Sequence, residues 1–103
     1  MMPAAPVAKL AELGAGRFAL EGELVFRTVT ALDRAAHRAF KGAKELEVDL
    51  AGVTRCDSAA LALLLEWAGR ARRSGAVLRY RSLPAALLAI AAISEVEDLL
   101  PRA

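Results

Sequence analysis

The stretch ELEVDLAGVTRCDSAALALLLEWAGRARRSGAVLRYR, Glu45 to Arg81, contains the patterns that decide the fold. Its first six residues alternate between acidic and apolar side chains, as expected for a strand with one buried face. A helix is predicted from about Ser58 to Ser74, where Gly75 follows as a stop signal. Ala76 to Arg81 is again extended. A strand, a helix and a second strand in this order predict a crossover that joins parallel strands.

The rest of the chain extends this unit in both directions. Pro84 in a first helical turn starts another helix. The other predicted elements, in chain order, are strands at Val7 to Leu13 and Arg17 to Glu21, a helix capped by Thr28 or Thr30 and running to about Lys41, a loop at Ala51 to Arg55, a helix to about Ile93 and a last turn at Val96 to Leu100. The sequence therefore predicts an α/β fold with a small mixed β-sheet covered by helices.

Length and composition favour one globular domain. The chain has 103 residues, of which 56% are hydrophobic and 25% charged, enough for a core without covalent staples. We expect a disordered tail at residues 1–6 and a single domain at residues 7–103. The only cysteine, Cys56, excludes an internal disulfide and favours a reducing compartment. The apolar run Leu83 to Ile93 is far shorter than the roughly 20 residues that span a bilayer, so we expect a cytoplasmic protein without direct membrane insertion.

The charge balance argues against a nucleic-acid-binding protein. The formal net charge is only +2, and the aromatic residues that interleave with basic ones in nucleic-acid-binding proteins are scarce. A modest arginine cluster keeps this class as a third alternative; its members are Arg70, Arg72, Arg73, Arg79 and Arg81. A solvated basic face is the simpler interpretation.

The sequence also argues against an enzyme. The single histidine, His37, lies in the middle of a predicted helix, and one cysteine cannot build a metal cluster of the usual spacing. Asp57 and Ser58 have no evident histidine partner for a catalytic triad. The turn at Gly14 to Gly16 precedes a strand and not a helix, so it does not make a phosphate-binding loop. We expect no catalytic residue, no metal and no cofactor.

The helix that begins at Ser58 is apolar over an unusually wide arc. On a helical wheel the apolar side chains cover about 200°, twice the roughly 100° stripe that core packing needs. Leu63 and Trp67 lie one turn apart on the flank of this arc, next to Arg70. Two interpretations remain open: the helix lies deep between the sheet and another helix, or it exposes an apolar ridge to a partner protein.

The head of the same helix has two interpretations as well. Asp57 and Ser58 are both strong N-cap residues, which accept a hydrogen bond from a free backbone N–H of the first turn. A hydroxyl at a helix N-terminus also lies where the backbone stabilises a phosphate. Ser58 is therefore either a structural residue or a phosphoacceptor.

These motifs resemble the STAS domain of anti-sigma-factor antagonists and related proteins. The resemblance is carried by Val48 to Pro84: a strand, then Asp49-Leu50 with Val53, then Asp57-Ser58 directly before an apolar helix. It extends over about residues 7–101 and implies a small sheet with helices on one side.

Two functions within that family follow from the resemblance. Anti-sigma-factor antagonists are phosphorylated on the serine after the aspartate by a serine kinase that is also the anti-sigma factor, which implies Ser58 here. The continuation Ala59 to Ala62, with Leu63 to Trp67, is more similar to MlaB, the STAS subunit of a phospholipid-transport ABC complex. That similarity implies a cytoplasmic ABC ATPase subunit (MlaF-like) as partner and a location at the inner membrane through it. The implied docking surface consists of Asp57, Ser58, Leu61, Leu63, Trp67 and Arg70.

Overall fold

A computed structural model describes residues 5–103 of the chain. The elements follow the predicted order of strands and helices. Their bounds are β1 Ala8–Gly14, β2 Arg17–Leu24, α1 Phe26–Ala39, β3 Glu45–Cys56, α2 Ser58–Ser74, β4 Val77–Arg81, α3 Ala85–Ile93 and a short 3-10 turn, η1, at Glu97–Leu99. The predicted tail at residues 1–6 lies mostly outside the described residues; Ala5 and Pro6 have no regular secondary structure.

The four strands form one mixed sheet in the order β1-β2-β3-β4. β1 and β2 make an antiparallel hairpin, whereas β2 pairs parallel with β3 and β3 parallel with β4. Each parallel pair is joined through a helix, so α1 and α2 are the two crossovers. In the hairpin turn Gly16 has a φ of +78° and backs onto the Glu45 carbonyl, where a Cβ would clash. The predicted α/β class and mixed sheet are confirmed.

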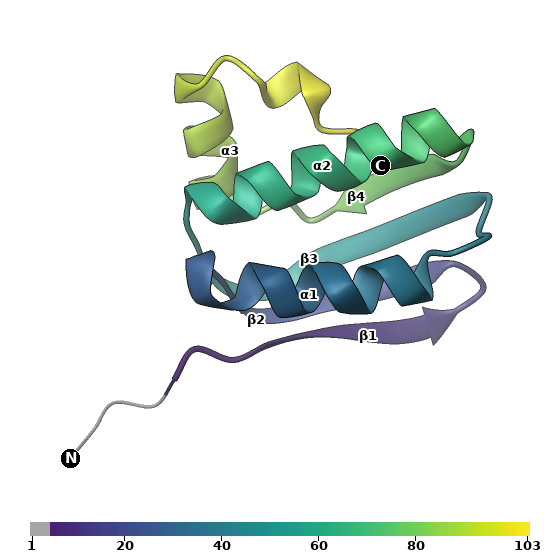
Figure 1. Cartoon of the computed structure of the whole chain (residues 1–103). Coiled ribbons are helices and arrows are strands. Elements are labelled where there is room, and N and C mark those ends of the chain that lie inside the picture. The colour runs from purple at the N-terminus through teal and green to yellow at the C-terminus, as the bar shows by residue number, and fades with distance from the viewer. Residues whose placement is uncertain (1–4) are drawn as a thin grey trace.

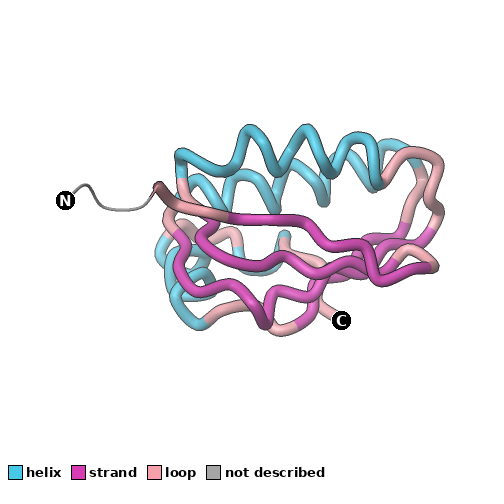
Figure 2. The backbone as a smooth tube through the Cα atoms, turned by 90° about the horizontal axis from the view of Figure 1, so that it is seen from below, coloured by secondary structure: helices cyan, strands magenta, loops and turns pink. Residues whose placement is uncertain are grey.

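The helices α1 and α2 lie side by side on one face of the sheet, and α3 lies beside the N-terminal end of α2 (Figure 1). The view from below shows the two long helices as a separate layer against the strands (Figure 2). Between these layers is one apolar core, in which Leu20, Val48 and Leu64 are fully buried. Tyr80 donates a hydrogen bond to the carbonyl of Leu64 at 2.6 Å, which ties β4 to α2.

β3 is longer than its sequence pattern predicts. The predicted loop at Ala51 to Arg55 is wrong, because this segment stays extended and continues the parallel pairing with β2, where Gly22 lies opposite Val53 and Leu24 opposite Cys56. Alternation is missing there because most of these side chains are exposed. Backbone pairing with a neighbouring strand, which no local pattern reports, therefore extends the strand up to the residue before Asp57.

α1 begins earlier than predicted. Val25, and not Thr28 or Thr30, is its N-cap residue. Thr28 lies one turn inside, where its Oγ1 accepts from the Val25 N–H at 3.0 Å and donates to the Glu23 carbonyl at 2.7 Å. The threonine does serve the helix start, but from inside the helix. As a result Phe26 becomes the first helical residue.

The C-terminal residues of the chain are attached to the edge of the sheet. The last residues run beside β4, with the Tyr80 N–H bound to the Pro101 carbonyl at 2.7 Å. Among residues 5–103, no helix has the length and apolar character needed to cross a membrane.

Candidate functional site

One carboxylate connects the starts of the two long helices. Asp57 is the N-cap residue of α2, and its Oδ1 accepts from the Ala59 N–H at 2.9 Å. Its Oδ2 accepts from the N–H of Phe26, the first residue of α1, at 3.1 Å. Both carboxylate oxygens are therefore occupied by free N–H groups of helix N-termini, where a negative charge is also favoured by the helix dipoles.

Ser58 is left free by this arrangement. It is the first residue of α2 and is exposed. Within the described chain its hydroxyl has no protein hydrogen-bond partner, whereas the neighbouring Asp57 carboxylate has two. The capping role that either residue could fill belongs to Asp57. Ser58 therefore presents an unused hydroxyl to solvent, as a partner contact or a phosphoacceptor requires.

Exposed apolar side chains lie at the same end of the molecule. Phe26 is 80% exposed although it is a large aromatic residue, and its backbone is held by Asp57 beside Ser58. Ile93, the last residue of α3, is 85% exposed. The starts of α1 and α2 and the whole of α3 lie at one end of the domain (Figure 1). We call the surface formed by Phe26, Asp57 and Ser58 the Ser58 end.

The interpretation that α2 exposes an apolar ridge to a partner protein is wrong. Leu61, Leu63 and Trp67 are 5%, 8% and 3% exposed, so they belong to the core. α1 covers the flank of α2: the Trp67 Nε1 donates to Asp33 Oδ1 at 2.9 Å, and the ring packs edge-on against Phe40 with centroids 5.3 Å apart. The wide apolar arc exists because α2 packs against the sheet on one side and between α1 and α3 on the others.

The Arg70 side chain also forms its contacts within the domain. Its Nη1 and Nη2 donate to the two oxygens of Asp33 at 2.7 and 3.2 Å, and its Nε donates to Glu66 at 3.1 Å. The hydrogen bonds from Arg70 lower the pKa of Asp33 despite partial burial, and the same pair raises the pKa of Arg70. Because Arg70 lies twelve residues after Ser58, about 18 Å along the helix, it is not part of the Ser58 end.

Two of the other four arginines of the cluster are paired with acidic residues. Arg73 lies 3.4 Å from Glu66, and Arg81 lies 2.6 Å from Glu47. With Arg70, three of the five clustered arginines are therefore engaged in ion pairs. Among residues 5–103, Arg72 and Arg79 are the members of the cluster that form no ion pair.

The thiol next to the site is not set up as a nucleophile. Cys56 ends β3 and is half-buried. Burial, and then the charge of Asp57, raise the pKa of its thiol. Because the reactive form of cysteine is the thiolate, Cys56 is a packing residue that leads the chain from the sheet to Asp57.

The predicted site residues thus separate into two groups. Asp57 and Ser58 lie at one exposed end, while Leu61, Leu63, Trp67 and Arg70 hold α2 in place. Sequence reasoning missed Phe26, because the helix was predicted to start at Thr28 or later. It also missed Ile93, which lies two residues beyond the buried Ala91 and so on the other side of α3.

Comparison with known proteins agrees with this fold. The family model described as "Mlab, STAS domain" matches residues 8–101. No curated protein sequence matches the chain. Among solved structures, the anti-sigma factor antagonist SpoIIAA in its unphosphorylated form has a TM-score of 0.69 at 14% identity, with 94% of this chain and 88% of that chain covered. The Bacillus cell fate determinant SpoIIAA in the phosphorylated form gives 0.69 at 15% identity, with 94% and 91% covered.

A third structure, that of Mglu, has a TM-score of 0.57 at 22% identity. The match covers 75% of this chain and 19% of the Mglu chain. At these identities the structures show the fold, and the family model, which spans nearly the whole domain, shows the family. The chain belongs to the family of MlaB-like STAS domains.

Proposed function

We propose that this chain is a non-catalytic interaction subunit that docks through its Ser58 end on the cytoplasmic ATPase of a phospholipid-transport ABC complex. The observation that carries the proposal is that the free, exposed Ser58 and the exposed Phe26 both adjoin Asp57, Ser58 in the chain and Phe26 through its backbone N–H. Asp57 holds both residues in place through the backbone of the two helices. Membership of the MlaB-like family supports the class of partner.

The composition of the Ser58 end suits a protein partner. Exposed aromatic side chains are frequent anchors of interfaces, because they bury a large apolar area at a low cost in conformational entropy. A hydroxyl beside such an anchor gives a directional polar contact at the edge of the interface. Ala62, exposed one turn after Ser58, keeps the first turns of α2 smooth enough for close approach.

The alternative is an anti-sigma-factor antagonist whose Ser58 is phosphorylated by a serine kinase that is also the anti-sigma factor. The exposure of Ser58 at a helix N-terminus favours this alternative, since a kinase needs an accessible hydroxyl. The solved structures of the anti-sigma factor antagonist SpoIIAA, in its unphosphorylated and phosphorylated forms, share the fold. A phosphate on Ser58 would add up to two negative charges next to the Asp57 carboxylate.

A pull-down of the tagged full chain from its native host separates the two functions. Bound proteins and the modification state of Ser58 are both read by mass spectrometry. Recovery of an ABC ATPase with unmodified Ser58 supports the transport function. Recovery of a small serine kinase with phosphate on Ser58 contradicts it and supports the sigma-factor switch.

Phe26→Ser and Leu13→Ser make a matched pair for this experiment. Both residues are exposed and apolar, but Leu13 lies at the far end of β1. The proposal expects Phe26→Ser to lose the partner and Leu13→Ser to keep it. Equal recovery with both variants would show that the partner binds elsewhere.

A further inference from the structure

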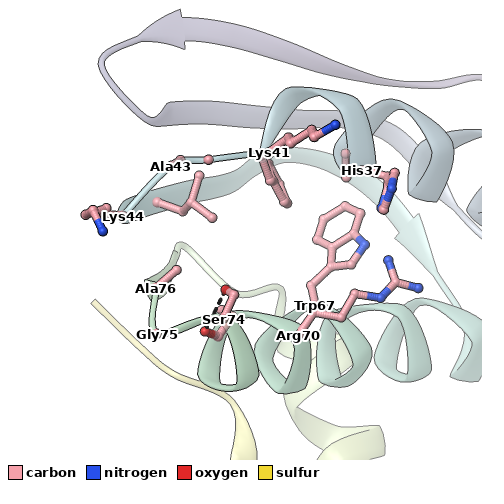
Figure 3. A pocket seen from close by; sticks show the side chains of 14 residues that line it. His37, Lys41, Ala43, Lys44, Trp67, Arg70, Ser74, Gly75 and Ala76 are labelled. Atoms are coloured by element: carbon pink, nitrogen blue, oxygen red, sulfur yellow. Dashed lines mark hydrogen bonds between the residues drawn. The ribbon is translucent and has the colours of Figure 1, made fainter.

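A second candidate site lies between the C-terminal halves of α1 and α2, at the opposite end of these helices from Ser58. It is a groove of about 440 Å³, within the range of roughly 300–1,000 Å³ that small-molecule sites occupy. Figure 3 shows the ring of Trp67 pointing from α2 into the space between the two helices, with Lys41 after the end of α1 and Lys44 directly before β3. None of the contacts described for the Ser58 end involves this groove.

The floor of the groove is apolar and rigid. Leu46, Trp67 and Ala71, which are nearly buried, form its base, and the part-exposed Phe40 adds accessible apolar surface. Phe40 is fixed from both sides, because its ring packs edge-on against Phe18 at 5.0 Å and against Trp67 at 5.3 Å between centroids. The groove stays open because small residues, among them Ala43 and Ala76, line its walls. Such a floor offers apolar contact but few polar partners, which suits an alkyl chain.

The rim of the groove is basic. The charged or titratable residues that line it are His37, Lys41, Lys44 and Arg70, and no acidic residue is among them. Arg70 is engaged with Asp33 and Glu66. Within residues 5–103, neither Lys41 nor Lys44 forms an ion pair, and both are exposed. Each lysine therefore leaves three ammonium N–H donors available at the rim, and Figure 3 shows the two side chains on different sides of the groove.

The helix ends limit the charge that this rim can accept. α1 and α2 both end here, so their last carbonyls bring partial negative charge that offsets part of the lysine charge. A doubly charged head group would be opposed more strongly than a singly charged one. The groove volume, at the low end of the range for ligand sites, further favours a single chain over two.

We propose that this groove binds a single-chain alkyl carboxylate, with the chain against the part-exposed Phe40, Ala43 and Ala76 and the carboxylate at the basic rim of Lys41 and Lys44. The site would give an interaction subunit a small apolar anion as a ligand, at a place distant from its partner surface. The proposal is independent of which protein binds the Ser58 end.

Decanoate, kept below its micelle concentration, is a suitable probe for the full chain. Trp67 is the only tryptophan, so its fluorescence reports directly on the groove. We expect a saturable change with one ligand per chain. Decyltrimethylammonium, which has the same chain with a cationic head, should bind at least tenfold more weakly. Equal binding of the two amphiphiles, or no saturable change with decanoate, overturns the proposal.

Three variants test the two halves of the ligand separately. Lys41→Ala/Lys44→Ala should weaken decanoate binding at least tenfold. Arg27→Ala/Arg79→Ala removes the same charge from exposed positions outside the groove and should leave binding within threefold. Ala43→Phe fills the groove and should abolish binding, while thermal unfolding confirms that the variant is folded. Equal losses in the two double variants, or unchanged binding in Ala43→Phe, would show that no specific site exists.

Discussion

The carboxylate of Asp57 accepts hydrogen bonds from the backbone of both long helices, and its contact with the N–H of Phe26 joins residues 31 positions apart in the chain. The Asp-Ser pair at the head of α2 is thereby divided into two roles. Asp57 holds the starts of α1 and α2 at a fixed separation, and Ser58 is left free. The shape of the Ser58 end depends on this one side chain.

Replacement of Asp57 should therefore lower the free energy of unfolding by more than the loss of an ordinary N-cap residue does. We expect Asp57→Ala to lower the free energy of unfolding by about 2 kcal/mol, the upper part of the range for N-cap residues, because the Phe26 N–H also loses its partner. Asp57→Asn should cost less, since one amide oxygen still accepts. Urea denaturation measures both. Asp98→Ala, an exposed aspartate near the C-terminus, is the control; an equal loss there would contradict the double role.

Ser58→Ala should have almost no effect on stability. Because Asp57 provides the cap, the free energy of unfolding should change by less than about 0.5 kcal/mol, as for other exposed positions. Urea denaturation of the two proteins, side by side, tests this. A loss of about 1 kcal/mol, the usual cost of removing a cap, would show that the serine hydroxyl supports the helix after all.

Trp67→Ala should destabilise the domain by about 3–5 kcal/mol, the usual cost of removing a large buried aromatic side chain. Thermal and urea denaturation measure the loss. Trp67→Phe should cost less, because it keeps contact with Phe40 and loses mainly the hydrogen bond to Asp33. A folded Trp67→Ala protein of normal stability would contradict the core position of Trp67 and return it to the surface.

The ion pair of Asp33 and Arg70 should make stability depend on pH in the acid range. Since Arg70 lowers the pKa of the folded Asp33 below its ordinary value of 3.8, the pair contributes stability above that value. The contribution is lost as the pH falls through the lower folded pKa. The side chains are 32% and 40% exposed, so the contribution should be no more than about 1 kcal/mol.

Comparison with Asp33→Asn isolates this effect from other titrating groups. The stability difference between wild type and Asp33→Asn should be constant from neutral pH to about pH 5. It should shrink on further acidification, as measured by urea denaturation at each pH. A difference that stays constant down to the acid transition would show that Asp33 titrates alike in the folded and unfolded chain.

The fold was largely predictable because its signals are local. Alternation over Glu45 to Leu50, the caps around α2 and the stop at Gly75 each report on a few neighbouring residues, and together they imply the crossovers. The second half of β3 was not predictable, since pairing with β2 and not side-chain alternation keeps Gly52 and Val53 in the sheet.

The candidate site was only half predictable for a related reason. Asp57 and Ser58 stood out as a helix start, but the division of roles between them depends on Phe26, which is distant in sequence. Periodicity showed that α2 has too much apolar surface for one contact. It could not tell whether another helix or another protein covers Trp67. The answer required the position of α1, which places Asp33 and Phe40 against that ring.

Docking through the Ser58 end is tested most directly by the affinity of the purified chain for the proposed ATPase partner, compared between Ser58→Arg and Leu13→Arg. Both substitutions place the same bulky cationic side chain at exposed positions, at opposite ends of the domain. The account predicts that Ser58→Arg weakens binding at least tenfold, about 1.4 kcal/mol, while Leu13→Arg binds like wild type and both remain folded. Wild-type affinity in Ser58→Arg, or a loss confined to Leu13→Arg, would contradict docking through the Ser58 end.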